Sequence, residues 1–241
     1  MTEKLSVEER FQNIEHNLEY INSRIEASAK ESGRTRGDIK LMAVTKTVEP
    51  VFINHAIDCG IDLIGENKVQ EFLSKKEYLK LENCKAHLIG HLQTNKVRQI
   101  IGQVSMIQSV DSLKLAREIE KQAQKLKITA DCLIEVNVGN EESKTGIDFS
   151  SVMPLLEEIS SMNGVCVKGL MAIPPICSER EELLKYFEKM HRLFVDIKAQ
   201  NIDNINMQIL SMGMSGDYNE AILCGANLVR IGSSIFGPRL Y

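Results

Sequence analysis

A lysine at the end of an apolar run is the first residue that could do chemistry. Lys46 closes the run Leu-Met-Ala-Val-Thr-Lys that begins at Leu41. If Lys46 faces a site rather than bulk water, desolvation lowers the pKa of its amine. A neutral amine can attack an aldehyde and form a Schiff base. The alternative is a strand-end lysine whose long stem carries its ammonium out to solvent.

Small residues follow two apolar runs in the last quarter of the chain. One group comprises Ser211, Ser215 and Gly216, and the other comprises Gly232, Ser233 and Ser234. Hydroxyls and backbone N–H groups in such turns can bind phosphate, with help from a helix N-terminus. The competing interpretation is that these residues only form turns and caps. Asp217, which we expect to cap a helix, disfavours an anion beside that helix end.

Arg230 lies inside the second of these apolar runs, where a guanidinium needs a partner. That partner could be an acidic side chain or the ring nitrogen of a ligand. A lysine that forms a Schiff base, a phosphate cradle and an arginine facing a ring together describe a pyridoxal phosphate site. These residues are also compatible with a barrel that binds phosphate without a cofactor, in which Lys46 contributes only its positive charge.

Other polar residues carry weaker signals. His87 and His91 are four apart in a predicted strand and would face the same side, but no third ligand follows at a useful spacing, so we predict no metal site. For Glu66, Asn67 and Asn137, at predicted strand ends, structural hydrogen bonding explains each as well as ligand contact does. A further set of basic residues is interpreted as solvated helix surface: Lys68, Lys75, Lys76, Lys96 and Arg98.

Eight predicted strands must position these residues, and each except the last is followed by a clear helical pattern. The alternation predicts an α/β fold with a parallel sheet, and eight such units fit a single (β/α)8 TIM barrel. An open, doubly wound sheet would show a glycine-rich turn after its first strand, and the turn at 45–50 has no glycine. The predicted strands are Ile39–Thr45, Leu63–Glu66, Ala86–Gly90, Met106–Val110, Asp131–Val138, Val165–Ile173, Met207–Met212 and Leu228–Gly232.

An extra helix precedes the barrel. Ser6 and Glu9 fit a capping box, and an apolar stripe at helical spacing runs from Phe11 to Ile25. We expect this helix, residues 1–33, to pack on the barrel. No linker or low-complexity segment marks a boundary, so residues 1–241 are predicted to form one domain.

Composition excludes several classes of protein. The 29 Lys and Arg against 33 Asp and Glu give a net charge of -4, which argues against sequence-independent nucleic-acid binding. We expect no membrane span and no secretory signal, because no apolar run approaches about 18 residues and the first residues lack an apolar core. The 6 cysteines form no C-x-x-C pair, which suggests reduced, mostly buried thiols in a cytoplasmic protein.

Six motifs in order resemble the pyridoxal phosphate homeostasis proteins. They are Ala43–Lys46, Gly65–Asn67, His87–Lys96, Lys168–Ala172, Leu210–Ser215 and Val229–Gly237. The resemblance implies a barrel like the N-terminal domain of alanine racemase, with Lys46 forming the internal aldimine. It also implies phosphate contacts from Ser211, Gly232 and Ser233, Arg230 near the pyridine nitrogen, and Asn67 lining the cofactor. Many relatives have Gly-Thr at the last turn, and serine offers a hydroxyl there as well.

The resemblance implies a binding and homeostasis protein that buffers pyridoxal phosphate or delivers it to apo-enzymes, without robust catalysis and with no catalytic residue assigned. The alternative is an amino-acid racemase with Lys46 and a second base such as Tyr218 or His91. Racemisation needs two positioned groups. Alanine racemases take the second from a β-rich domain, and we expect no such domain here, because the sequence ends at Tyr241 directly after the eighth unit. The barrel rim lacks an obvious apolar interface, so we expect a monomer.

Overall fold

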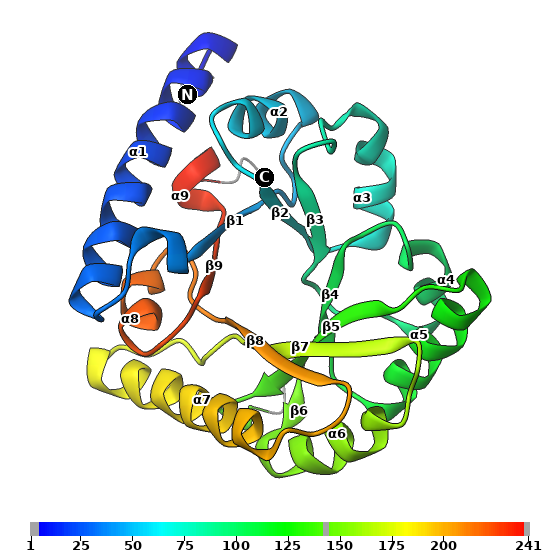
Figure 1. Cartoon of the computed structure of the whole chain (residues 1–241). Helices are drawn as coiled ribbons and strands as arrows, with labels where there is room; N and C mark the ends of the chain where they lie inside the picture. Colours follow the sequence, from blue (N-terminus) through cyan, green and yellow to red (C-terminus); the bar gives the residue numbers. More distant parts are fainter. Residues whose placement is uncertain (1–4, 142–144, 239–241) are drawn as a thin grey trace.

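One closed parallel sheet forms the centre of the molecule. The structure is a computed structural model and describes residues 5–141 and 145–238. The 9-stranded sheet has the order β4-β3-β2-β1-β9-β8-β7-β5-β6, and an additional pairing of β4 with β5 closes it. The two-residue strand β6 lies outside the closure, which leaves eight strands in the barrel. Figure 1 looks into this ring, with the helices around it, so the predicted (β/α)8 barrel is confirmed.

The strands follow the predicted ones closely. They are β1 Lys40–Val44, β2 Leu63–Glu66, β3 Lys85–Leu88, β4 Met106–Val110, β5 Ala130–Asn137, β6 Ile147–Asp148, β7 Val165–Ala172, β8 Ile205–Ser211 and β9 Leu228–Ile231. The α-helices are α1 Val7–Glu31, α2 Pro50–Asp58, α3 Val69–Lys75, α4 Val97–Ile100, α5 Leu113–Leu126, α6 Val152–Ser160, α7 Arg180–Gln200, α8 Tyr218–Leu223 and α9 Ser233–Phe236. Short 3-10 turns are η1 Arg36–Asp38, η2 Lys76–Tyr78, η3 Thr94–Lys96 and η4 Phe149–Ser151.

Two details differ from the prediction. The eighth barrel strand ends at Ile231 and is followed by the short helix α9, so the last strand also has its helix. His91 lies beyond the end of β3 and is exposed, whereas His87 is buried within that strand. The two histidines therefore do not form the same-face pair that their spacing suggested.

Side chains alternate across each strand and separate the core into two parts. A large cluster fills the space between the strands and the helices. Two small clusters lie on the opposite, inner face of the strands: Met42, Leu63 and Leu228 in one, and Met106, Leu133 and Met171 in the other. The barrel interior is thus closed by an apolar plug, and residues two positions further along the same strands form the next layer toward the carboxyl ends.

The N-terminal helix packs on the barrel as expected. Its start is fixed by the predicted capping box, in which Ser6 N–H donates to Glu9 at 2.8 Å and Glu9 N–H donates to Ser6 Oγ at 3.2 Å. Its apolar stripe is buried at Ile14, Leu18, Ile21 and Ile25. The helix contacts α2, α8 and α9, beside which it lies in Figure 1.

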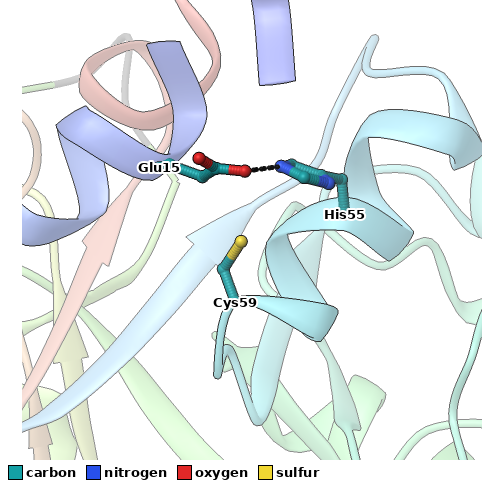
Figure 2. Close-up of side chains that lie close together, drawn as sticks. All are labelled: Glu15, His55 and Cys59. Carbon is teal, nitrogen blue, oxygen red and sulfur yellow. Dashed lines mark hydrogen bonds and ion pairs between the residues drawn. The ribbon is translucent and has the colours of Figure 1, made fainter. Parts of the chain in front are cut away.

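A polar contact joins α1 to α2 (Figure 2). Nε2 of His55 lies 3.0 Å from Oε1 of Glu15, and Phe11 stacks on the imidazole with ring centroids 4.0 Å apart. Cys59 caps the same end of α2, and its sulfur lies within 4.8 Å of a ring nitrogen of His55 and a carboxylate oxygen of Glu15. Because the carboxylate and the imidazole already hydrogen-bond to each other, we interpret this contact as a structural link between α1 and α2. Cys59 is exposed, whereas Cys84, Cys132 and Cys166 are buried as predicted.

None of the helices in the described residues combines the length and apolar character that crossing a bilayer requires.

Candidate functional site

The turn after β1 holds Lys46 in an uncommon backbone conformation. Lys46 is half-buried and lies two residues beyond Val44, where β1 ends. The next residue, Thr47, has a φ of 63°, in the left-handed region that β-branched residues rarely adopt. Such strain costs about 1–3 kcal/mol and persists only where the surroundings hold it. The polypeptide around Lys46 is therefore positioned by contacts outside the turn itself.

Polar side chains form the layer above the apolar plug. Arg230 follows Leu228 by two positions, Ser211 follows Ile209, and Gln108 follows Met106, so all three face the barrel interior. Each is buried, with exposed fractions of 3% for Arg230 and 0% for the other two. Because β1 and β9 are parallel neighbours, with Met42 opposite Arg230, this layer lies below the turn that carries Lys46.

These side chains form one hydrogen-bonded chain across the barrel. Nη1 of Arg230 donates to Oγ of Ser211 at 2.7 Å, and that hydroxyl donates to Oε1 of Gln108 at 2.8 Å. The amide nitrogen of Gln108 lies 2.8 Å from Nδ1 of His87. Since the oxygen of Gln108 is the acceptor, its nitrogen must donate, and Nδ1 of His87 must accept. The chain links β9, β8, β4 and β3.

Burial sets the protonation states at the two ends of this chain. Burial lowers the pKa of His87 to about 3, so the ring is neutral and carries its proton on Nε2. Burial also lowers the pKa of Arg230 to about 10, against the opposing charges of Asp217 and Glu135. The guanidinium stays charged at neutral pH. It donates to two neutral oxygens, those of Ser211 and the Ala172 carbonyl at 2.9 Å.

The two small-residue turns meet above β8 and β9. The backbone N–H groups of Gly232 and Ser234 both point at Oγ of Ser215, at 3.4 Å each. A Cβ on Gly232 would lie 3.3 Å from Val44, so this turn lies close against β1 and favours glycine. Gly232 and Ser234 thus donate to one half-buried hydroxyl at the carboxyl ends of the strands, and an oxyanion could replace that hydroxyl as their acceptor.

The other predicted phosphate contacts differ in their exposure. Ser233 is exposed on the same turn. The hydroxyl of Ser211 is occupied by Arg230 and Gln108 inside the barrel, so its contact with a phosphate stays a prediction. Sequence reasoning favoured Ser211 over Ser215, and the geometry makes Ser215 the hydroxyl that lies beside the N–H groups. The signal in the sequence that pointed to Ser215 was its place in the run of small residues after β8.

Polar residues at the ends of β2 and β5 have mostly structural partners. Asn67 is half-buried after β2, and a Cβ on Gly90 would lie 2.3 Å from its carbonyl oxygen, so the two loops are in contact. Glu66 accepts from Oγ1 of Thr45 at 2.8 Å and pairs with Lys75. Asn137 bonds twice to the backbone of Glu141.

The structure corrects the interpretation of Lys75 as solvated surface. Its side chain is 12% exposed, and its ammonium contacts Glu66 and Glu71 as well as the Thr45 carbonyl. The only signal in the sequence was the i,i+4 spacing from Glu71, which many surface pairs share.

The two candidates for a second base lie in different places. His91 is exposed beyond β3, and its Nδ1 lies 3.2 Å from a carboxylate oxygen of Asp111. Tyr218 is 5% exposed within the core cluster between strands and helices. Its phenol interacts with Arg24 of α1 and with Asn219, and its pKa is raised, chiefly by burial. Tyr218 therefore faces the N-terminal helix on the outside of the barrel.

Comparison with known proteins identifies the family. The model of the alanine racemase N-terminal domain matches residues 10–239. A pyridoxal phosphate homeostasis protein of Aquifex aeolicus is 42% identical over 224 residues, which cover 93% of this chain and 97% of that protein. The chain belongs to the pyridoxal phosphate homeostasis protein family. A member from Haemophilus influenzae is 38% identical over 95% of this chain and 97% of its own.

Solved structures agree with this membership. The protein PipY of Synechococcus elongatus, solved with pyridoxal phosphate bound, is 29% identical with a TM-score of 0.81, over 93% of this chain and 100% of its own. Alanine racemase from Corynebacterium glutamicum has a TM-score of 0.71 at 13% identity, which shows a shared fold. The match covers 96% of this chain and 62% of the racemase.

Proposed function

We propose that this protein binds pyridoxal 5'-phosphate as a Schiff base on Lys46 and acts in vitamin B6 homeostasis. The observation that carries the proposal is that three kinds of group suited to binding pyridoxal phosphate lie at one end of the barrel. A half-buried lysine, a buried guanidinium and two converging N–H groups all lie at the carboxyl ends of β1, β8 and β9. The family membership and the cofactor bound to PipY support it.

Each of these residues has a proposed role toward the cofactor. Lys46 would hold the cofactor through its amine, which can condense with an aldehyde with loss of water, and the turn of Gly232 and Ser233 would hold the phosphate, together with the predicted contact from Ser211. Arg230 would donate toward the pyridine nitrogen, and Asn67 would line the ring. When bound, pyridoxal phosphate supplies a reactive aldehyde and an electron-withdrawing ring. A charged arginine at the nitrogen keeps the ring unprotonated, which weakens that electron sink.

We further propose a carrier rather than an enzyme with robust turnover. Racemisation needs a second proton-transfer group on the opposite face of the substrate from Lys46. Tyr218 faces α1 instead, and the exposed His91 pairs with Asp111.

We propose that the protein acts in the cytoplasm as a monomer and a single domain of residues 1–241, and that it passes cofactor to apo-enzymes. Neither the fold nor the net charge of -4 points to a nucleic-acid or membrane partner.

Two measurements separate the proposal from its rivals. Titration with pyridoxal phosphate should produce the absorbance band of a Schiff base, whereas a barrel that binds only phosphate leaves the spectrum of the free aldehyde. Exchange of the α-proton of alanine in deuterium oxide then distinguishes a carrier from a racemase. A carrier exchanges at about the rate of free cofactor, and exchange many times faster would establish the racemase instead.

A further inference from the structure

We propose that Lys75 is a positioning residue for Lys46: together with Glu71 and Glu66 it holds both peptide groups that flank the reactive lysine. The inference rests on the proposed function, because it concerns how the Schiff-base lysine is presented. Lys75 and Glu71 come from α3 and Glu66 from the end of β2, so all three lie outside the turn that they hold.

The contacts reach the backbone on both sides of Lys46. The peptide group before it, Thr45–Lys46, accepts through its carbonyl oxygen from Nζ of Lys75 at 3.0 Å. The peptide group after it, Lys46–Thr47, donates through the Thr47 N–H to Oε1 of Glu71 at 2.5 Å. The two peptide planes that define the Cα position of Lys46 are therefore both held by α3.

Lys75 is the centre of this cluster. Its ammonium contacts Oε1 of Glu66 at 3.0 Å and Oε1 of Glu71 at 2.5 Å, in addition to the Thr45 carbonyl. A lysine ammonium has three N–H donors, and the three oxygens account for all of them. Glu66 in turn accepts from the hydroxyl of Thr45 at 2.8 Å, which fixes that residue by a second route.

Burial makes the cluster depend on the charge of Lys75. Glu66 is 1% exposed, and burial raises the pKa of its carboxyl, while the adjacent charge of Lys75 acts to lower it. Burial also acts to raise the pKa of Glu71, but hydrogen bonds from Lys75 and from the Thr47 N–H outweigh it, and the pKa falls. Removing the ammonium would leave two nearby carboxylates without their shared partner.

This arrangement explains the uncommon conformation of the turn. The positive φ of Thr47 brings its N–H to Glu71, and without that contact the turn could relax toward ordinary backbone angles. Because a Schiff base forms only when the amine meets the aldehyde at bonding distance, a relaxed turn lowers the fraction of molecules in which the bond can form. The phosphate-binding turn belongs to β8 and β9, so it should be little affected.

The test compares two ligands that differ at one atom group. Pyridoxal 5'-phosphate carries the aldehyde, and pyridoxine 5'-phosphate carries an alcohol there and cannot form the Schiff base. In Lys75→Met, we expect the dissociation constant of the aldehyde to rise about tenfold, while that of the alcohol changes by less than about twofold. The matched control is Lys76→Met, because Lys76 is the next residue and its ammonium bonds to Gln103 at 2.6 Å. This control should change neither constant by more than about twofold.

Two outcomes would overturn the inference. Equal losses for both ligands in Lys75→Met would mean a general structural role, and no loss for either would mean that Lys46 needs no such support. If circular dichroism shows that Lys75→Met is unfolded, Glu71→Ala decides by the same criterion, since it removes the acceptor of the Thr47 N–H at a side chain that is 21% exposed. Failure of the proposed function is seen separately, as a wild-type protein that forms no Schiff base.

Discussion

Arg230 combines a structural role in the barrel with the ligand-binding role that we propose for it. Its guanidinium is buried, and a neutral hydroxyl and a carbonyl oxygen are its hydrogen-bond partners. A buried charge held only by neutral groups is costly, so it is favoured where a ligand or nearby acids balance it. Its partner Ser211 is held in turn by Gln108, so the position of the guanidinium depends on residues from three other strands.

We predict that Arg230→Ala weakens pyridoxal phosphate binding by about tenfold or more and shifts the absorbance of the bound cofactor, because a charged hydrogen bond to the ring is lost. Equilibrium titration with spectra at each point measures both. Arg192→Ala is the control, since Arg192 is 79% exposed on α7. An unchanged affinity and spectrum would mean that Arg230 only stabilises the barrel.

His87 gives a prediction about pH. Its folded-state pKa of about 3 lies below the ordinary value of 6.5, so the unfolded chain binds a proton between these values and the folded chain does not. The contribution of His87 to the free energy of unfolding is therefore fully present above about pH 6.5 and is lost as the pH is lowered toward 3. Lowering the pH from about 7.5 to 5 should reduce the free energy of unfolding by about 2 kcal/mol through this group alone.

Urea unfolding of wild type and His87→Gln at the two pH values checks this. The variant should lose about 2 kcal/mol less than wild type over the interval, since glutamine does not titrate. His191→Gln, at an exposed histidine, serves as the control for histidine removal in general. An identical pH dependence in wild type and His87→Gln would show that His87 titrates normally in the folded protein.

At the scale of elements, local patterns predicted most of the helices and strands. The Ser6 capping box and the stripe from Phe11 to Ile25 indicate α1 because they are contiguous in the chain. The strands appear as apolar runs because both of their faces are buried. The short elements α4, β6 and α9 carry too few residues for a periodic pattern and depend on tertiary contacts.

The N-terminal helix should contribute strongly to stability. Ile25 is 0% exposed where α1 meets the barrel, and Ile25→Ala leaves a cavity that we expect to cost about 3 kcal/mol of unfolding free energy. Tyr20→Ala, at a side chain 59% exposed on the same helix, should cost less than about 0.5 kcal/mol beyond its change in helix propensity. Denaturant unfolding of both variants measures the difference. Equal costs would mean that α1 is only loosely docked.

At the scale of the whole molecule, the alternation of strands and helices was sufficient to predict the barrel, because a closed parallel sheet has few alternatives at this length. The positions of Lys46 and Arg230 at the carboxyl ends followed from that architecture. The contacts of Lys75 could not be predicted, because they join β1, β2 and α3 through a turn with a positive φ. The series of hydrogen bonds from Arg230 to His87 could not be predicted for the same reason, since its residues come from four strands.

Borohydride reduction followed by peptide mass mapping tests the central claim most directly, because it converts a Schiff base into a permanent bond and locates it. Wild-type protein incubated with pyridoxal phosphate should carry one reduced adduct on the peptide that contains Lys46. Lys46→Ala should retain its fold by circular dichroism and carry no adduct there. A wild-type protein without this adduct, or an adduct of the same mass on another lysine that persists in Lys46→Ala, would contradict the account.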